Sequence, residues 1–437
     1  MPQDQMEKIV SLCKRRGFVY PGSEIYGGLA ATYDYGPLGA ELKKNIKDLW
    51  WNYFIQQRDD MLGLDSNIIL SPKIWEASGH IKNFKDPLVE CKKCHQRFRP
   101  DKLADTSKCP ECGKKLTEPK MFSGMFKTTI GAVEKKGVET YLRPETAQAI
   151  FTNFKNVLDS TSKKLPFGVG QMGKTFRNEI TTGNFIFRTI EFEQMEIEYF
   201  IPPGRDWNKI FEGWLEYIYG YADLIGLSRQ NFFNREISDK ERAFYSKRTI
   251  DIEYQFPFGR DELWAIAYRT DYDLAAHQEA SGQSLEYFDE TTKKRFIPHV
   301  IEPTFGVDRT MLAVLSQAYN EEELVGKGKR VVLKLKPNIA PYKVAVFPLL
   351  ANKPRLVELA RKIYNDLKMD FNCAWDDRGN IGKRYYSQDE IGTPFCITVD
   401  FDSLEKGDVT VRDRDNMKQE RIIISELKDY LENKRLL

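Results

Sequence analysis

Residues 175–200 read TFRNEITTGNFIFRTIEFEQMEIEYF, and this stretch predicts two antiparallel strands joined by a polar loop. Its second half, from Phe185 to Phe200, is rich in the aromatic and β-branched residues that favour strands. A cluster of turn residues, Thr181 to Asn184, separates this half from the strand-like beginning at Thr175. The stretch is therefore interpreted as a β-hairpin.

Successive side chains of a strand point to opposite faces of a sheet. One face of the return strand then collects Arg188, Phe192, Gln194 and Glu196, and the other collects Glu191, Glu193, Met195 and Ile197. An arginine, an aromatic plane and acids on one face suit a ligand with a phosphate, a flat base and an ammonium group. An exposed hairpin with cross-strand ion pairs explains the same alternation of charge.

The run FRNE, a short loop and then Arg188-x-x-x-Phe192 resembles motif 2 of the class II aminoacyl-tRNA synthetases. In detail the stretch is similar to the glycyl-tRNA synthetases of the homodimeric type. The resemblance implies that Arg177 binds the α-phosphate of ATP and the carboxylate of the amino acid, and that Phe192 stacks on adenine. It further implies ATP contacts from Asn178, Glu179, Phe187 and Arg188, and glycine contacts from Glu193, Gln194 and Glu196. Ile190 stands where the family usually has an arginine.

The composition is that of an ordinary globular protein long enough for two or three domains. The chain has 437 residues, of which 41% are hydrophobic and 30% charged, with a formal net charge of +2. This balance neither demands nor excludes RNA as a partner. The N-terminal residues lack an apolar segment of signal-peptide length, and no run of about 18 apolar residues occurs, so we expect a cytoplasmic protein without a membrane partner.

The first 84 residues predict three helices and one strand. Apolar residues at helical spacing predict a helix that ends at Gly17, and a second, amphipathic helix over 38–58. The stretch 64–84 predicts a strand that ends before Pro72 and a short helix after it. This region is similar to motif 1 of the family, which implies a homodimer whose interface includes the helix at 38–58. From the residues alone, such a helix belongs to the core in most proteins.

Four of the seven cysteines form two Cys-x-x-Cys pairs, Cys91 with Cys94 and Cys109 with Cys112. Two such pairs with turn residues after each fit a tetrahedral zinc site, which requires sulfurs about 3.5 to 4 Å apart. A redox dithiol or accidental pairing is the alternative. We interpret residues 88–122 as a zinc-binding insertion, in which Arg99 matches a position that the family uses near the substrate. The other three cysteines are expected to be buried thiols.

The stretch TYLRPETAQAIFTNF (140–154) predicts a strand that ends at Pro144 and then a helix. It resembles the family sequence LRPETAQGIF, in which the acid, here Glu145, binds the ammonium group of glycine. An acid at a helix N-terminus is also explained by the helix dipole alone. Ala149 stands where the family has glycine.

The stretch FGVGQMGKT (167–175) matches both the P-loop pattern and the dinucleotide-binding pattern, which would make the protein an NTPase. Both motifs need a hydrophobic strand before them and a helix after them. Here Lys163 to Pro166 precede the stretch and the strand-like FRNEI follows it. We reject both matches and expect the glycines to let a strand pass beneath the ligand.

Two later stretches complete the expected catalytic domain. Residues 249–277 alternate as antiparallel strands, and the family implies that Glu262 binds magnesium and that Leu263 belongs to the ATP site. Residues 296–319 predict a strand and a helix and resemble motif 3. That resemblance implies ATP contacts from Gly306, Asp308 and Arg309, magnesium or ammonium binding by Glu302, and a glycine contact from Thr304, which replaces a serine. Alternatively, Arg309 is an ordinary exposed arginine at the start of a helix, without a role in binding.

The last quarter of the chain predicts a small α/β domain after a charged linker over 321–341 that contains one strand. Strands then alternate with helices at 353–368 and 424–434. The sequence is similar to the anticodon-binding domain of several class II synthetases, which implies tRNA contacts from Lys383, Arg384, Arg412 and Arg414. A solvated charged rim is the default for any one of these residues.

Together these observations predict an α+β protein with an antiparallel catalytic sheet, a zinc-knuckle insertion and a mixed α/β C-terminal domain. The expected boundaries are 1–87 and 123–336 for the catalytic domain, 88–122 for the insertion and 337–437 for the anticodon-binding domain. The resemblance implies activation of glycine by ATP and Mg²⁺, with Arg177 and Arg309 as the catalytic residues, and transfer to tRNA(Gly), with structural Zn²⁺ and no DNA partner. A synthetase-like binding protein without activity is the alternative, although this chain retains the motif arginines.

Overall fold

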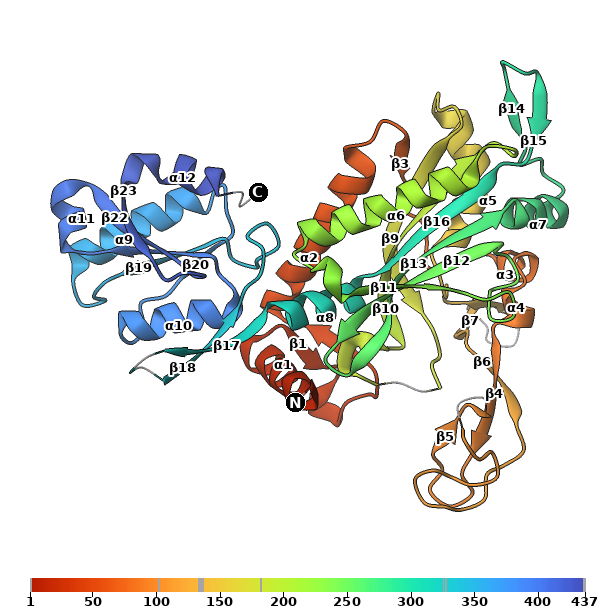
Figure 1. Ribbon diagram of the computed structural model, residues 1–437, viewed down its shortest axis with the longest axis horizontal. Coiled ribbons are helices and arrows are strands. Elements are labelled where there is room, and N and C mark those ends of the chain that lie inside the picture. Colours follow the sequence, from red (N-terminus) through yellow and green to blue (C-terminus); the bar gives the residue numbers. More distant parts are fainter. Residues whose placement is uncertain are drawn as a thin grey trace.

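The computed structural model describes residues 2–100, 103–132, 137–180, 183–324, 326 and 328–434. Figure 1 shows a large domain, a narrow extension that leaves it, and a smaller C-terminal domain. Within the described ranges, none of the helices combines the length and the apolar composition that crossing a bilayer requires.

The large domain is built on a seven-stranded sheet in the order β11-β12-β13-β16-β10-β9-β3. Neighbouring strands are antiparallel except for β3 and β9. The predicted hairpin is the β9–β10 pair, in which Phe192 lies opposite Thr175. The antiparallel catalytic sheet is thus confirmed. The strands are β3 (Met61–Gly63), β9 (Phe167–Phe176), β10 (Glu191–Ile201), β11 (Phe232–Glu236), β12 (Arg248–Phe256), β13 (Gly259–Thr270) and β16 (His299–Gly306).

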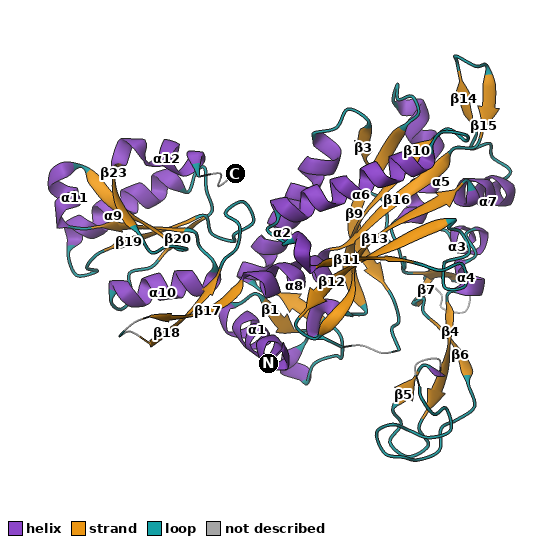
Figure 2. Ribbon diagram, in the orientation of Figure 1, coloured by secondary structure: helices purple, strands orange, loops and turns teal. Residues whose placement is uncertain are grey.

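Helices cover both faces of this sheet, and the alternation of strand residues separates two cores (Figure 2). Met195 and Ile197 of β10 enter the larger core, whereas Phe200 of the same strand enters the smaller one. The helices on the larger core are α1 (Pro2–Arg16), α2 (Pro37–Trp51), which continues as a π-helix over Asn52–Gln56, α6 (Trp207–Leu224) and α8 (Val307–Ala318). Those on the smaller core are α5 (Ala147–Ser160) and α7 (Tyr272–Ser281).

Short elements complete the large domain. The strand expected over 64–71 is absent from the structure, where only Ile69 forms an isolated bridge, to Leu142. The edge position beside β9 is instead taken by β3, which ends at Gly63. The short elements are β1 (Val19–Pro21), β2 (Tyr33–Tyr35), α3 (Pro72–Ala77), α4 (His80–Asn83), β7 (Lys127–Ile130), β8 (Val138–Tyr141), β14 (Tyr287–Asp289), β15 (Lys294–Phe296) and 3₁₀ turns at Glu24–Tyr26, Phe185–Phe187 and Arg229–Asn231.

The glycine-rich stretch 167–175 lies within β9. A P-loop would be a loop between a strand and a helix, so the position of this stretch within a strand agrees with the rejection of that motif. Its glycines, however, make room for protein side chains rather than for a ligand. A Cβ atom at Gly170 would lie 2.3 Å from the Ile55 side chain, and one at Gly173 would lie 2.0 Å from the Arg143 guanidinium. The expectation that these glycines pass beneath the ligand is therefore wrong for both positions.

The extension between α4 and β7 contains a three-stranded sheet in the order β5-β4-β6. Its strands are β4 (Lys85–Glu90), β5 (Arg97–Phe98) and β6 (Lys120–Ser123). Figure 1 shows that this sheet projects away from the main sheet. Its small core consists of Val89, Leu116 and cysteine side chains, so few apolar contacts hold it together.

The C-terminal domain is a five-stranded mixed sheet in the order β20-β19-β21-β22-β23, as predicted in type. Before it, the expected linker with one strand forms two: β17 (Tyr319–Leu324) pairs antiparallel with β18 (Gly328–Leu333), and Glu322 forms an ion pair with Arg330 across them. The other elements are β19 (Val344–Pro348), α9 (Pro354–Leu367), β20 (Cys373–Trp375), α10 (Ile381–Ile391), β21 (Phe395–Val399), α11 (Phe401–Lys406), β22 (Asp408–Asp413), β23 (Gln419–Ile423), a 3₁₀ turn at Ile424–Glu426 and α12 (Leu427–Asn433).

Candidate active site

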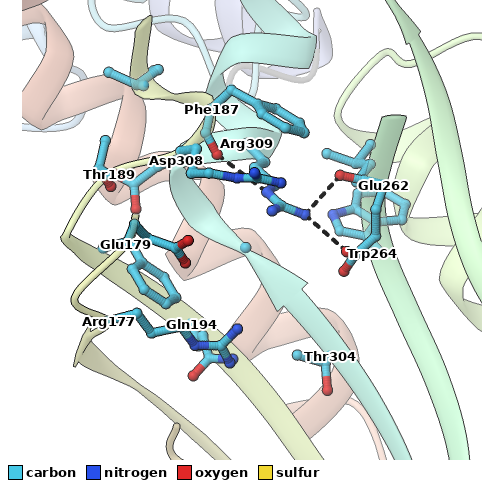
Figure 3. Close-up of a pocket in the computed structure, with 15 residues that line it drawn as sticks. Arg177, Glu179, Phe187, Thr189, Gln194, Glu262, Trp264, Thr304, Asp308 and Arg309 are labelled. Atoms are coloured by element: carbon cyan, nitrogen blue, oxygen red, sulfur yellow. Dashed lines mark hydrogen bonds and ion pairs between the residues drawn. The ribbon is translucent and has the colours of Figure 1, made fainter. Parts of the chain in front are cut away.

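A pocket with a volume of about 150 Å³ lies on the main sheet between the β9–β10 connection, β13 and the start of α8 (Figure 3). Ten of the eleven residues predicted to bind ATP line it, and they come from three separate parts of the chain. Asn178 lies beside the pocket, and its backbone N–H donates to the carbonyl of Gly124. The lining residues are Arg177, Glu179, Ile186, Phe187, Arg188, Thr189, Phe192, Gln194, Glu262, Leu263, Trp264, Thr304, Gly306, Asp308 and Arg309.

Arg177 is the first residue after β9, and its side chain turns back over the sheet. Its Nε donates to the carbonyl oxygen of Pro144 at 3.0 Å. The guanidinium carbon lies 5.4 Å from the centre of the Phe192 ring, which β10 places on the same face. A cation and an aromatic plane therefore lie together at one end of the pocket. Figure 3 shows Arg177 beside Gln194 at this end.

Arg309 lies in the first turn of α8, where Gly306 ends β16. Its Nε donates to the carbonyl oxygen of Phe187, and its second nitrogen lies 3.2 Å from the Glu262 carboxylate (Figure 3). The guanidinium also covers the Phe187 ring at 4.4 Å. The helix N-terminus and this arginine together make the end of the pocket opposite Arg177 suitable for an anion.

Glu193 is directed away from the pocket, contrary to its predicted role in glycine binding. Strand alternation places its side chain on the α2 face, where it pairs with Lys43 at 2.8 Å and Lys47 at 3.0 Å. Asp308 accepts hydrogen bonds from Lys43, from Tyr35 and from the backbone N–H of Glu193. The Asp308 carboxylate thus holds α2, β10 and α8 together at the back of the pocket and has little capacity left for ATP.

A second pocket adjoins the first and shares Arg177, Gln194 and Thr304 with it. Three carboxylates predicted to bind glycine line this second pocket, which we call the acid pocket. They are Glu145, Glu196 and Glu302. Arg177 therefore lies where the two pockets meet.

Each carboxylate of the acid pocket has its own buried partners. Glu145 lies 3.2 Å from Nε2 of His80 and accepts from the Gln148 amide at 3.0 Å. Glu196 accepts from the hydroxyl groups of Thr146 and Thr304, the latter at 3.1 Å. Glu302 accepts from Arg269 at 2.7 Å.

The pKa values of these acids diverge because their partners differ. Burial acts to raise the pKa of all three, and His80 reverses this effect for Glu145, whose pKa falls below its usual value. The pKa of Glu302 is raised well above the ordinary value by burial and by the charges of Glu196 and Glu145, although Arg269 opposes the shift. Groups crowded in this way favour a cationic ligand, which would lower the cost of ionising them.

The two residues predicted to share magnesium do not meet. Glu302 lies opposite Ala267 in the β13–β16 pairing, five residues along β13 from Glu262. At about 3.3 Å per residue this separates the two backbone positions by roughly 16 Å. Glu262 lies in the first pocket beside Arg309, and Glu302 lies in the acid pocket beside Arg269. Glu302 is therefore withdrawn from the magnesium site.

Arg99, predicted to lie near the substrate, is located in the extension and forms an ion pair with Asp86 at 3.2 Å. Three residues around the acid pocket were not predicted from the sequence: Arg269, Asp273 and His80. Arg269 and Asp273 are four residues apart within the RTDYDL stretch, and this spacing was the available signal.

The four thiols of the extension are brought together from two loops. The sulfur of Cys94 lies 3.6 Å from those of Cys109 and Cys112, and Cys91 lies 3.4 Å from Cys112. All four sulfurs lie within 4.8 Å of one another. This spacing fits the tetrahedron that four thiolates form around a metal ion.

Three of the four residues predicted to contact tRNA are buried. Arg384, Arg412 and Arg414 are 2–4% exposed, and Arg412 forms two hydrogen bonds with the buried carboxylate of Asp389. Such guanidinium groups cannot present their charge to RNA, so the expectation for these three residues is corrected. Lys383 is exposed on α10 and stays a prediction.

Residues 126–318 match the family model of the tRNA synthetase class II core domain (G, H, P, S and T), and residues 343–434 match that of the anticodon binding domain. The antiparallel sheet, the arginine-lined pocket and these two matches define a class II aminoacyl-tRNA synthetase.

Curated relatives extend over nearly the whole chain. A glycine–tRNA ligase of Lachnospira eligens is 53% identical over 98% of both chains, and one of Clostridium acetobutylicum is 51% identical over 98% of both. A third, from Lachnoclostridium phytofermentans, is 52% identical with the same coverage. The chain belongs to the glycine–tRNA ligase family.

Proposed function

We propose that the protein activates glycine with ATP to form glycyl-adenylate and pyrophosphate, and then transfers glycine to the 3′ end of tRNA(Gly). The observation that supports this most directly is the junction at Arg177. There a pocket with three arginines and an aromatic ring opens into a pocket with three buried carboxylates.

In this proposal the first pocket binds ATP. Arg177 contacts the α-phosphate, Arg309 contacts the γ-phosphate end, and Phe192 stacks on the adenine ring. Arg188 supplies a third cation along the phosphates. Glu262 would hold magnesium, which, when bound, supplies further neutralisation of the phosphate charge.

The acid pocket binds glycine in the orientation that the reaction needs. Glu145, Glu196 and Glu302 surround the ammonium group, and Arg177 holds the carboxylate next to the α-phosphorus. A carboxylate oxygen then attacks that phosphorus, the bond to the β-phosphate oxygen breaks, and pyrophosphate leaves. This step needs orientation and charge neutralisation more than proton transfer, and fixed arginines provide both.

In the second step the terminal ribose hydroxyl of tRNA attacks the adenylate carbonyl, and AMP leaves. In this proposal glycine is selected by size, because a larger side chain would meet the walls of the site. Attraction alone discriminates weakly, since one methylene group changes the binding free energy by only about 1 to 3 kcal/mol.

The other parts of the chain support transfer. We assign the C-terminal domain to the anticodon of tRNA, and the four thiolates of the extension to one structural zinc ion. We also propose a homodimer. Ile25 and Tyr26, in a loop between β1 and β2, are 88% and 87% exposed, and a second copy would bury such apolar side chains.

Pyrophosphate exchange with each of the twenty amino acids tests the proposal. We expect exchange that depends on glycine alone. Exchange with a different amino acid would contradict the substrate assignment. ATP binding without exchange for any amino acid would identify a synthetase-like binding protein instead.

A further inference from the structure

Arg269 lies beneath the acid pocket and does not line it. Its side chain is 1% exposed and donates to both carboxylate oxygens of Asp273, at 2.7 and 2.8 Å. A third bond, also 2.7 Å long, reaches one oxygen of Glu302. The guanidinium therefore joins a carboxylate of the pocket to a carboxylate that lies behind it.

Two aromatic rings restrict the guanidinium. The Tyr245 ring centre lies 3.8 Å from the guanidinium carbon, and the Phe151 ring centre lies 5.2 Å from it. A planar group in contact with rings and paired bidentately has little freedom to rotate. The direction of the bond to Glu302 is thus set by the protein before any ligand arrives.

The backbone next to Arg269 is strained in a way that produces this pairing. The β13–β16 register shifts between Tyr268 and Thr270, and Thr270 has a φ of +58°. A left-handed conformation is an outlier for a β-branched residue. The resulting turn starts α7 at Tyr272 and returns Asp273 to Arg269 across the strand–helix junction. Strain of this kind is concentrated at functional sites.

Asp273 connects a second acid to the same arrangement. It accepts from the Gln148 amide at 2.9 Å, and that amide also donates to Glu145 at 3.0 Å. Asp273 is therefore connected to two carboxylates of the acid pocket, to Glu302 through Arg269 and to Glu145 through Gln148.

We propose that Arg269 and Asp273 are positioning residues that hold Glu302 with one oxygen toward the α-ammonium group of the amino acid. Asp273 pairs with Nε and Nη2 of the guanidinium, and Nη1 bonds one oxygen of Glu302. Without the bidentate pair to Asp273, the plane of the guanidinium is no longer fixed, and neither is the direction of its bond to Glu302. This inference rests on the proposed binding of an amino acid in the acid pocket.

The test is Asp273→Asn, which keeps the shape of the side chain and removes its charge. We expect KM for glycine to rise at least about tenfold in pyrophosphate exchange, while KM for ATP and kcat stay within about threefold. The matched control is Asp159→Asn, which breaks an exposed pair with Lys155 on α5 and should change none of these constants. An equal rise of both KM values, or no rise, would overturn the proposal.

A second variant covers the case in which Asp273→Asn does not fold. Arg269→Lys keeps a positive charge between Asp273 and Glu302 and removes the planar fork that pairs bidentately. The same selective rise in KM for glycine is expected. A folded lysine variant with an unchanged KM would refute the positioning role.

The two proposals fail in different ways. If the unmodified protein activates another amino acid, the assignment to glycine fails. The KM of that amino acid in the variants still tests whether Arg269 and Asp273 position the carboxylates around its ammonium group.

Discussion

Replacing Gly173 by alanine should destabilise the large domain, because the added methyl group would displace the side chain of Arg143. The new Cβ would lie 2.0 Å from a terminal nitrogen of Arg143, far inside any normal contact. The end of an arginine moves freely on a protein surface, but Arg143 is only 2% exposed. Its guanidinium would have to shift by more than about 1 Å within a close-packed interior.

The size of the effect follows from the hydrogen bonds that Arg143 makes. Its Nε donates to the carbonyl of Lys174 at 2.8 Å, and another nitrogen donates to the carbonyl and hydroxyl of Ser66 and the carbonyl of Asn67 at 3.0–3.3 Å. Hydrogen bonds to a charged group contribute about 1.5 to 3 kcal/mol each. Loss of two of them lowers the free energy of unfolding by about 3 to 6 kcal/mol.

The displacement should also reach the active site. The residue after Arg143 is Pro144, whose carbonyl accepts the hydrogen bond from Arg177. The carbonyl of Arg143 itself accepts from the backbone N–H of Phe176 at 2.9 Å. We therefore expect glycine-dependent pyrophosphate exchange to fall together with stability.

Urea denaturation followed by fluorescence measures the loss of stability. The control is Gly213→Ala in α6, where the added methyl group meets open space and a better helix former should stabilise by up to about 1 kcal/mol. A double-mutant cycle with Arg143→Ala then isolates the contact, since the loss should nearly vanish in that background. Unfolding of Gly173→Ala at the wild-type urea concentration, or an equal loss without Arg143, would refute the reasoning.

Four further outcomes are expected. Arg177→Ala should lower the rate of pyrophosphate exchange at least about a hundredfold, because it removes charge stabilisation at the reacting phosphate. Lys174→Ala breaks an exposed ion pair with Glu191 and should lower this rate far less. Equal losses in the two variants would support the P-loop interpretation. Elemental analysis should find one zinc ion per chain, and Cys109→Ser should release it; a metal-free, fully active protein would contradict the site. A chain that ends after Ala340, which is buried in the larger core, should keep exchange within several-fold and lose tRNA charging, and charging at the full-length rate would exclude the C-terminal domain as the RNA reader. Burial lowers the pKa of Lys343 to about 8. Between pH 8 and 10.5 the unfolded state therefore binds more protons at this residue than the folded state, and the free energy of unfolding rises with pH. This rise should be absent from urea unfolding of Lys343→Met, and identical pH dependences of the two proteins would disprove it.

Local patterns determined much of the fold. The β9–β10 hairpin follows from two strand-forming runs around a turn cluster, and α6 follows from apolar residues at helical spacing with a cap at Asp206. The Cys-x-x-Cys pairs likewise predicted the grouping of four sulfurs. In each case the interacting residues are close in sequence, so spacing alone specifies the geometry.

The motif residues of the first pocket were also predictable, but their functional neighbours were not. Strand alternation predicted that Glu193 and Gln194 lie on opposite faces of the sheet. The structure confirms this, because Glu193 pairs with Lys43 and Lys47 of α2, and it contradicts the glycine contact that the resemblance implied. The separation of Glu262 from Glu302 depends on the register of β13 against β16, which no local pattern reveals.

Only the tertiary structure decided which charged side chains are available to a ligand. Arg384, Arg412 and Arg269 look like surface cations in the sequence, yet each is buried against carboxylates or carbonyl groups from distant parts of the chain. Burial of a charge requires partners that neutralise it, and those partners are brought together by packing between elements. Sequence patterns therefore determined most of the strands and helices and the grouping of the four cysteines. The long-range pairing of Arg269 with Glu302 and of Arg330 with Asp389 was set by the folded chain, because the free energy of a buried ion depends on everything that surrounds it.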